Sequence, residues 1–259
     1  MKKVLFFFLA ILFVISCNEK KQEVPKNADV LVDNLKGKVD ETTETDYKTD
    51  STGKIGEQDS CCVINVKYDE KGYISAYSSA HKNGSEKEEE IFIHNDNGTM
   101  KSLKNTKNGT PISAISIQID KDGKYKTAQE TDSTNKLSAY YTDLTENDYG
   151  QLTSLKKYKP DSTLESSMTS TYDKQFFKSN EVKDSVGKVT YSSTVKLDDK
   201  NNVIQRASKT VTKDSTINKV TTYKYISFDD NGNWTQRTEM DENGKPVKIT
   251  KRVITYYKE

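Results

Sequence analysis

A short turn element recurs along the sequence from residue 69 onward and constrains the fold more than any other feature. The element is Asp or Asn, two further residues and then Gly, with Asn in the Gly position of one variant. Copies begin about 26 residues apart, a period that signals a repeat architecture. They begin at Asp69, Asn95, Asp120, Asn147, Asp173 (a degenerate copy), Asp199 (the Asn variant) and Asp229.

The chemistry of this element predicts hairpins. Asp or Asn at the first position and Gly at the fourth are typical of a type I turn. The Asx side chain can accept hydrogen bonds from backbone amides of the turn. Gly tolerates the positive φ of the bulge that completes a hairpin. We therefore expect each copy to join two antiparallel strands.

A second set of turn signals lies midway between the first, at Asn83-Gly84, Asn108-Gly109 and their later counterparts. Turns then recur about every 13 residues and leave strands of roughly 7–10 residues, which are normal lengths for a sheet. Several segments alternate as strands do, such as Ile115, Ile117 and Ile119 against Ser116 and Gln118. No segment after Val63 has a helical period.

The turn geometry also predicts which residues face each other. The residue before the Asx should lie opposite the residue five positions after it. Most of the resulting pairs are apolar or aromatic, and such pairs stabilise a sheet. The predicted pairs are Tyr68–Ile74, His94–Met100, Ile119–Tyr125, Phe228–Trp234 and the weaker Glu146–Leu152 and Asp198–Ile204. For Phe228 and Trp234 we expect both rings on one buried face.

The predicted fold class is all-β, a long antiparallel meander of about 14–15 strands. An open twisted sheet of more than about 10 strands curls, splits or closes, so we expect a curled or rolled sheet. A barrel embedded in a membrane is disfavoured, because many strands carry Lys, Glu and Ser on one face and little beyond Tyr and Thr on the other.

The N-terminus has the features of an export signal. Lys2 and Lys3 precede an apolar run, Val4 to Ile15, that is too short to span a bilayer. Val14-Ile15-Ser16-Cys17 resembles the lipobox of bacterial lipoproteins. The resemblance implies cleavage before Cys17, lipid on its thiol, and therefore a membrane as partner. Asn18 in place of Asp favours the outer membrane by the lipoprotein sorting rule; the leaflet stays open.

Three regions follow from these features. Residues 1–16 are the predicted signal peptide, residues 17–60 a flexible tether, and residues 61–259 the repeat-built β domain. The tether is polar and shows no sustained apolar period, and such composition is typical of a disordered segment. Removal of Lys2 and Lys3 lowers the formal charge from +1 to about −1, so nothing favours a nucleic-acid partner.

The adjacent Cys61 and Cys62 leave two interpretations open. They are two small residues at the start of the first strand, or they are oxidised, to each other or to another molecule, in an oxidising compartment. Neighbouring strand side chains point to opposite faces, which disfavours a bond between them.

The segments Tyr68-Asp69-Glu70-Lys71-Gly72-Tyr73-Ile74 and Phe228 to Trp234 resemble the tyrosine–aspartate (YD, or RHS-type) repeats of bacterial surface proteins. The C-terminal stretch Asn231 to Arg237 and the end at Tyr257 are similar to those of uncharacterised Gram-negative lipoproteins. Large RHS proteins wrap such strands into a shell around a toxin. This chain lacks that length and a toxin-like tail, so that role is not implied.

No motif indicates a reaction or a cofactor. His81 and His94 have no metal-ligand spacing. The acidic turns at Asp120 and Asp229 lack the frame of a calcium-binding loop, and turn formation explains them.

The strand tyrosines either form the apolar face of the sheet, which we favour, or stack on sugars. We therefore predict a non-enzymatic envelope lipoprotein with an interaction or scaffold module, the alternative being glycan capture by exposed tyrosines.

Overall fold

Asx turns join the strands, and their hydrogen bonds explain why the element recurs. The computed structural model describes residues 24–50 and 52–258. The Asp69 carboxylate accepts hydrogen bonds from the backbone N–H groups of Lys71 and Tyr73, both at 2.9 Å. Gly72 has a φ of +87°, which glycine adopts readily. Asp120 and Asp229 accept the same two bonds within their own turns.

The described residues form one helical turn, α1 (Asp29–Val32), and sixteen strands. The strands are β1 (Val39–Thr49), β2 (Ile55–Tyr68), β3 (Ile74–Ala80), β4 (Glu88–His94), β5 (Met100–Lys107), β6 (Thr110–Ile119), β7 (Tyr125–Asp132), β8 (Leu137–Glu146), β9 (Leu152–Tyr158), β10 (Leu164–Asp173), β11 (Phe176–Asp184), β12 (Val189–Leu197), β13 (Val203–Val211), β14 (Thr216–Phe228), β15 (Trp234–Met240) and β16 (Pro246–Tyr256).

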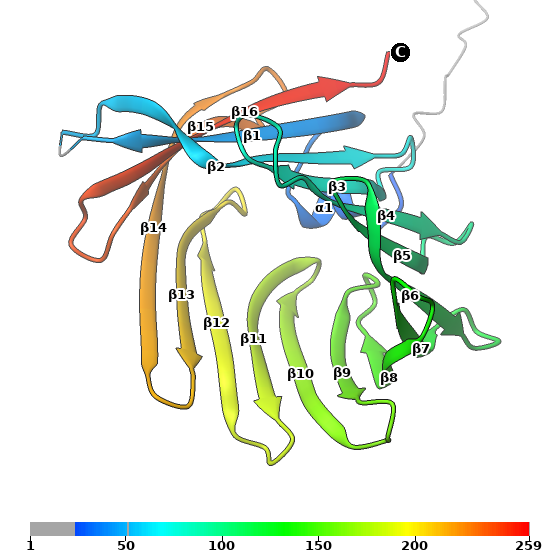
Figure 1. The fold of residues 1–259 in the computed structure, drawn as a ribbon. Helices are drawn as coiled ribbons and strands as arrows, with labels where there is room; N and C mark the ends of the chain where they lie inside the picture. Colours follow the sequence, from blue (N-terminus) through cyan, green and yellow to red (C-terminus); the bar gives the residue numbers. More distant parts are fainter. Residues whose placement is uncertain (1–23, 51, 259) are drawn as a thin grey trace, which may run out of the picture.

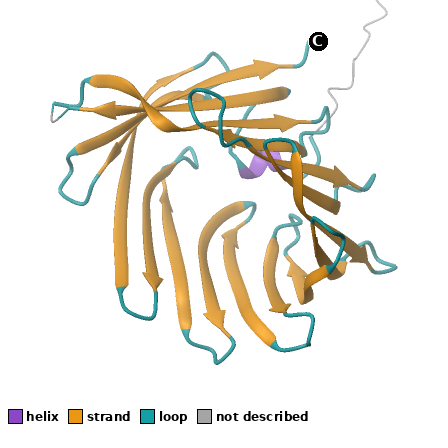
Figure 2. Cartoon of the chain, in the orientation of Figure 1, coloured by secondary structure: helices purple, strands orange, loops and turns teal. Residues whose placement is uncertain are grey.

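These strands form a single antiparallel sheet that closes into a barrel (Figure 1). Each strand pairs with its neighbours in the chain, and β1 pairs with β16, with Glu44 opposite Arg252. Strands make up nearly all of the fold, and short loops join them at both ends (Figure 2). The predicted all-β meander and its curl are confirmed, and closure removes the open edges that a sheet otherwise presents.

The boundary of the β domain differs from the predicted one. The sequence predicts a flexible tether over residues 17–60, yet α1, β1 and the start of β2 lie in the described part of that range, which raises the strand count to sixteen. Polarity explains the difference. The side chains of β1 that point into the barrel include Glu44 and Asp46, which pair with basic residues rather than apolar ones. Residues 1–23, with the predicted signal peptide and Cys17, lie outside the described residues.

The strand register confirms five of the predicted cross-strand pairs and corrects one. The confirmed pairs are Tyr68–Ile74, His94–Met100, Ile119–Tyr125, Glu146–Leu152 and Phe228–Trp234. The predicted Asp198–Ile204 pair is wrong, because Leu197 lies opposite Val203. That turn begins one residue earlier than the sequence indicated, at Asp198, and Asn201 takes the positive φ of 64°.

Burial of the Phe228–Trp234 pair is unequal. Trp234 is 6% exposed, whereas Phe228 is 42% exposed, so the expectation of two buried rings is wrong for Phe228. A register shift separates Ser227 from Phe228 and brings Phe228 to the end of the barrel. There the Lys200 ammonium lies 5.6 Å from the centre of the Phe228 ring.

The two faces of the sheet differ in chemistry. Paired residues of adjacent strands point to the same face, and Val66, Ile74 and Ile254 identify the inner face because they pack against the segment that carries α1. The register then gives the outer face, which is rich in Ser, Thr, Lys and Gln. Examples are Ser167, Thr169 and Thr171 on β10, Ser192, Thr194 and Lys196 on β12, and Thr222 and Lys224 on β14.

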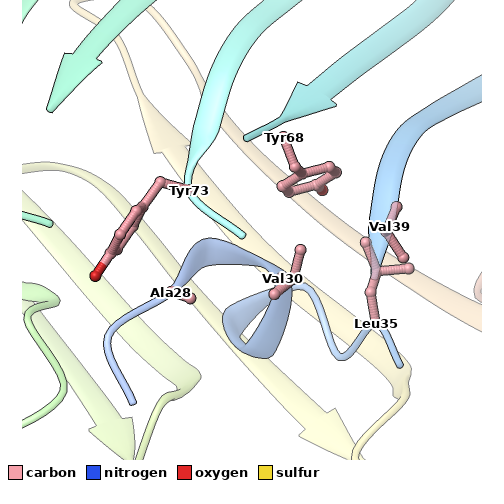
Figure 3. Packing of buried hydrophobic residues seen from close by; sticks show 6 residues of the cluster. All are labelled: Ala28, Val30, Leu35, Val39, Tyr68 and Tyr73. Carbon is pink, nitrogen blue, oxygen red and sulfur yellow. The ribbon is translucent and has the colours of Figure 1, made fainter. Parts of the chain in front are cut away.

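A cluster of buried apolar residues lies at one end of the barrel. Ala28, Val30, Leu35, Val39, Tyr68 and Tyr73 form this cluster. Figure 3 shows the six side chains gathered around α1 and the strand ends beside it. Ala28 is 0% and Val39 2% exposed, so the segment that precedes β1 is a packed part of the fold.

Candidate functional site

A segment that precedes β1 covers the end of the barrel at which the turns of the 26-residue repeat lie, such as those at Asp69 and Asp229. We call residues 24–38 the plug segment. Figure 1 shows α1, which this segment carries, inside the curve of the sheet. Its contacts run from turn to turn around that end. The backbone N–H of Val30 donates to the Gly72 carbonyl at 3.1 Å, and the Asn34 amide donates to the Lys200 carbonyl at 2.9 Å.

A reciprocal pair of hydrogen bonds fixes the last part of the plug segment. The backbone N–H of Lys36 donates to the Asn233 side-chain oxygen at 2.8 Å, and the Asn233 amide donates back to the Lys36 carbonyl at 2.9 Å. Asn233 is 2% exposed. Because an unpartnered buried amide is costly, the plug segment and the β14–β15 turn each supply the hydrogen-bond partners that the other needs.

Asp33 brings a carboxylate into the covered end. The Tyr68 hydroxyl donates to Asp33 Oδ2 at 2.6 Å. Burial raises the pKa of Asp33 to about 6, although the Tyr68 hydrogen bond and the charge of Arg252 lower it. The folded protein therefore binds a proton at Asp33 at a higher pH than the unfolded chain does.

This pKa gives a testable pH dependence. Between about pH 4 and 6 the folded state holds more protons at Asp33 than the unfolded state, so this group stabilises the fold increasingly as pH falls. When the pH falls from 7 to 4.5, we expect the unfolding free energy of the wild type to rise by about 2 kcal/mol relative to that of the Asp33→Asn variant. Urea unfolding at several pH values measures this gain. Parallel profiles for the two proteins would contradict the raised pKa.

An ion-pair network lies on the inner wall where β1, β15 and β16 meet. Glu44 joins Arg237, at 3.4 Å, and Arg252, whose Nε donates to it at 2.9 Å. Lys248 joins Asp46 at 2.9 Å and Glu239 at 3.2 Å. These groups are mostly buried, and a buried charge requires such partners.

Trp234 lies between two members of this network. The Arg252 guanidinium is 3.6 Å and the Arg237 guanidinium 4.4 Å from the Trp234 ring centre. Tyr225 lies beside the same ring, at 5.8 Å between centroids. Cation–π contacts of this kind are strongest at tryptophan and strengthen where water is excluded.

These residues form part of the wall of a cavity of about 260 Å³, which we call the arginine cavity. The plug segment contributes Val32, Asp33 and Asn34, and the other lining residues come from β11 to β16 and the β12–β13 turn. They are Phe176, Phe177, Val195, Leu197, Asn201, Asn202, Val203, Arg206, Tyr225, Trp234, Arg237 and Arg252.

A second cavity, of about 510 Å³, lies under the other half of the plug segment. His94 lines it and stacks on Tyr73 with ring centroids 5.2 Å apart. Burial lowers the pKa of His94, which favours the neutral ring. The charged lining residues are Lys26 and Lys124 against Asp29, Asp122, Glu146 and Asp148, so acidic residues outnumber lysines in this cavity.

The other residues that the sequence singled out lie apart from both cavities. Cys61 and Cys62 are joined by a disulfide in β2, which is the oxidised alternative. His81 lies in the β3–β4 turn, where its backbone bonds to Ser85. Within residues 24–50 and 52–258, no group of three or more His, Cys, Asp or Glu side chains is placed to hold a metal ion.

Most strand tyrosines point inward, as the favoured interpretation predicted. Tyr77, Tyr141, Tyr223 and Tyr225 share the inner face with Val66 and Ile117 through the strand register. The outer face carries Tyr140 and Tyr158, which stack on each other at 5.2 Å.

The arginines are the residues that sequence reasoning missed. The chain has 40 basic residues, and only Arg206, Arg237 and Arg252 are arginine. This scarcity is a signal that the sequence did offer. Their convergence on one cavity requires the register of four strands, which the turn pattern alone does not give.

One solved structure shares the fold. A porin-like protein from Bacteroides uniformis aligns with a TM-score of 0.52 and 14% identity, over 84% of this chain and 96% of that one. A porin-like protein from Bacteroides vulgatus gives a TM-score of 0.42 at 11% identity, over 85% and 100% of the two chains. At this identity the likeness concerns the barrel alone.

A further structural match is the Photorhabdus luminescens Tc holotoxin pore, with a TM-score of 0.31 and 12% identity, over 82% of this chain and 13% of that one. No protein-family profile matches the sequence, and a comparison with curated proteins finds no match. The resemblance to YD repeats therefore stays a prediction. In the described part of the chain, no helix has the length and apolar character needed to cross a membrane.

Proposed function

We propose that this protein is a lipid-anchored envelope lipoprotein. Its barrel is exposed to water on the outer face and binds a ligand in its lumen without catalysis. The observation that carries the proposal is the distribution of side chains on the two faces. Serine, threonine and lysine dominate the outer face. A barrel embedded in a bilayer needs a continuous apolar band there, and the outward apolar residues Ile91, Ile93 and Val253 lie among polar neighbours.

The inner face supports the same proposal. Phe92, Leu103 and Ile115 lie side by side on β4, β5 and β6, and Leu155 pairs with Met168 across β9 and β10. A polar exterior around a partly apolar interior is the arrangement of water-borne barrels that enclose a ligand. An aqueous membrane channel has an apolar exterior instead.

Lipid on Cys17 would hold the barrel close to the bilayer. Six residues separate Cys17 from Val24, the first described residue of the plug segment. A fully extended chain spans at most about 3.6 Å per residue, so the reach is on the order of 25 Å. The end that the plug segment covers would then face the membrane surface.

Cys17→Ala tests the anchor and the water-facing barrel together. We expect the wild type to incorporate radioactive palmitate and to partition into the detergent phase of Triton X-114. The variant should lose the label and, once residues 1–16 are removed, move to the aqueous phase, because the polar outer face has no affinity for detergent. Cys61→Ser/Cys62→Ser is the matched control and should keep both properties.

The two readouts separate the two parts of this proposal. Undiminished labelling of Cys17→Ala would remove the assignment of the anchor. An unlabelled variant that stays in the detergent phase without residues 1–16 would show that the barrel itself is embedded, which would overturn the water-facing interpretation.

Glycan capture receives less support. Its aromatic platform would have to lie on the outer face, where Tyr140 and Tyr158 already stack on each other. The tyrosines of the inner face are enclosed by the barrel wall and the plug segment.

A further inference from the structure

All three arginines of the chain, together with its only tryptophan, line one cavity. The other basic residues of the sequence are lysines, and no lysine lines the arginine cavity. Arginine and lysine carry the same charge, but only the planar guanidinium offers paired donors to a carboxylate and stacks on aromatic rings. A chain that uses lysine everywhere else therefore uses arginine where that geometry has a role.

The three arginines are not equivalent. Arg237 and Arg252 share Glu44 and stack on Trp234, so their side chains are held in place. Arg206 projects from the inner face of β13, opposite Val195 on one side and Thr221 on the other. Among the described residues, no carboxylate lies within ion-pair distance of Arg206, and its side chain is exposed to the lumen.

Charge around the cavity leaves one cation without a counterion. Glu44 compensates one of the two arginines that it joins, and Asp33, the only acidic residue in the cavity lining, lies near Arg252. The uncompensated positive charge is therefore at Arg206. A ligand with a single negative charge balances it.

The rest of the lining is suited to an apolar body. Phe176, Phe177, Val195, Leu197 and Val203 lie on the side of β11 to β13, with Tyr225 and Trp234 on the side of β14 and β15. The volume of about 260 Å³ lies below the roughly 300–1,000 Å³ of pockets for drug-sized ligands. A small molecule with one ring or a short chain has the matching size.

We propose that the arginine cavity binds a small organic monocarboxylate, with its carboxylate on the Arg206 guanidinium and its apolar body between Phe177 and Trp234. This inference rests on the proposed function, since it names the class of ligand that the lumen holds. The plug segment lines one side of the cavity through Val32 and Asn34, so the ligand lies between the barrel wall and that segment.

The fluorescence of Trp234, the only tryptophan, reports binding directly in the full-length protein. We expect 3-phenylpropionate and octanoate to change its emission saturably. The uncharged 3-phenyl-1-propanol should bind at least about tenfold more weakly, because it cannot pair with Arg206. Acetate, which has the charge without the body, should give no saturation in the same range.

Substitutions on β13 test whether the carboxylate of the ligand binds to Arg206. Arg206→Gln should weaken 3-phenylpropionate binding by about tenfold to a hundredfold, the size expected for a charge-assisted hydrogen bond. Arg206→Lys keeps the charge but loses the paired donors of the guanidinium. Its affinity should lie between those of the wild type and the Arg206→Gln variant. Lys209→Gln removes a cation from the outer face of the same strand and should bind as the wild type does. Matching circular dichroism spectra verify that the variants fold.

Three outcomes would overturn the assignment. They are the absence of saturation by either carboxylate up to about 10 mM, equal affinity for the uncharged alcohol, and undiminished binding by a folded Arg206→Gln variant. None of these affects the Cys17→Ala partition experiment, so failure of the ligand assignment is distinguishable from failure of the proposed function.

Discussion

Replacing Trp234 with alanine is expected to lower the unfolding free energy by about 3–5 kcal/mol, the usual cost of truncating a buried Trp or Phe. That is a large share of the roughly 5–15 kcal/mol that stabilises a whole domain. The ring is 6% exposed and lies between the guanidiniums of Arg237 and Arg252. Its loss leaves a void and removes both cation–π contacts, so two buried cations lose their support.

Urea unfolding followed by far-ultraviolet circular dichroism measures this effect, since the variant has no tryptophan. Gln236→Ala is the control on the same strand. Gln236 lies on the outer face opposite Lys251, where truncation costs within about 0.5 kcal/mol. A cost below about 1 kcal/mol for Trp234→Ala would show that the ring is not packed as described.

Gly98→Ala is expected to cost about 2–5 kcal/mol, because two penalties add. Gly98 has a φ of +84°, and an alanine in this region pays about 1–2 kcal/mol. Its Cβ would also overlap the hydroxyl and ring of Tyr73, and overpacking a filled site costs about 1–3 kcal/mol. Tyr73 cannot withdraw freely, since its hydroxyl donates to Asn27 of the plug segment at 2.9 Å.

Gly84→Ala isolates the backbone penalty. Gly84 has a similar φ of +78°, and no atom lies within 4 Å of the Cβ that alanine would add. We expect it to cost about 1–2 kcal/mol. Urea midpoints of the two variants give the comparison, and limited proteolysis should cut the plug segment faster in Gly98→Ala alone. Equal costs would mean that Tyr73 does not pack against the β4–β5 turn.

The turns were the most predictable part of this fold, because their chemistry is local. An Asx side chain and a Gly three residues later fix a hairpin through bonds within the turn, as at Asp69 and Asp229. The register of the hairpins at these repeat turns followed from the same geometry. The one register error arose at Asp198-Asp199, where two adjacent acids could begin the turn and the sequence does not say which does.

The plug segment and β1 were not predictable from apolar patterning. The inward residues of β1 include Glu44 and Asp46, whose partners lie about 200 positions later in the chain. A strand that buries ion pairs has the same composition as a solvated tether. The arginine cavity was missed for a related reason, since its lining comes from the plug segment and several strands that only closure of the sheet brings together.

Pairing of β1 with β16 has a consequence for the order of folding. Hairpins between neighbouring strands can form as soon as each pair of strands exists, because their loops are short. The contact between β1 and β16, in which Thr42 lies opposite Ile254, joins the two ends of the sheet. It forms only after residues 246–256 have been synthesised. Until then β1 has an unpaired edge that can pair with other chains. Closure of the sheet is therefore the slow and aggregation-prone step in the folding of this barrel.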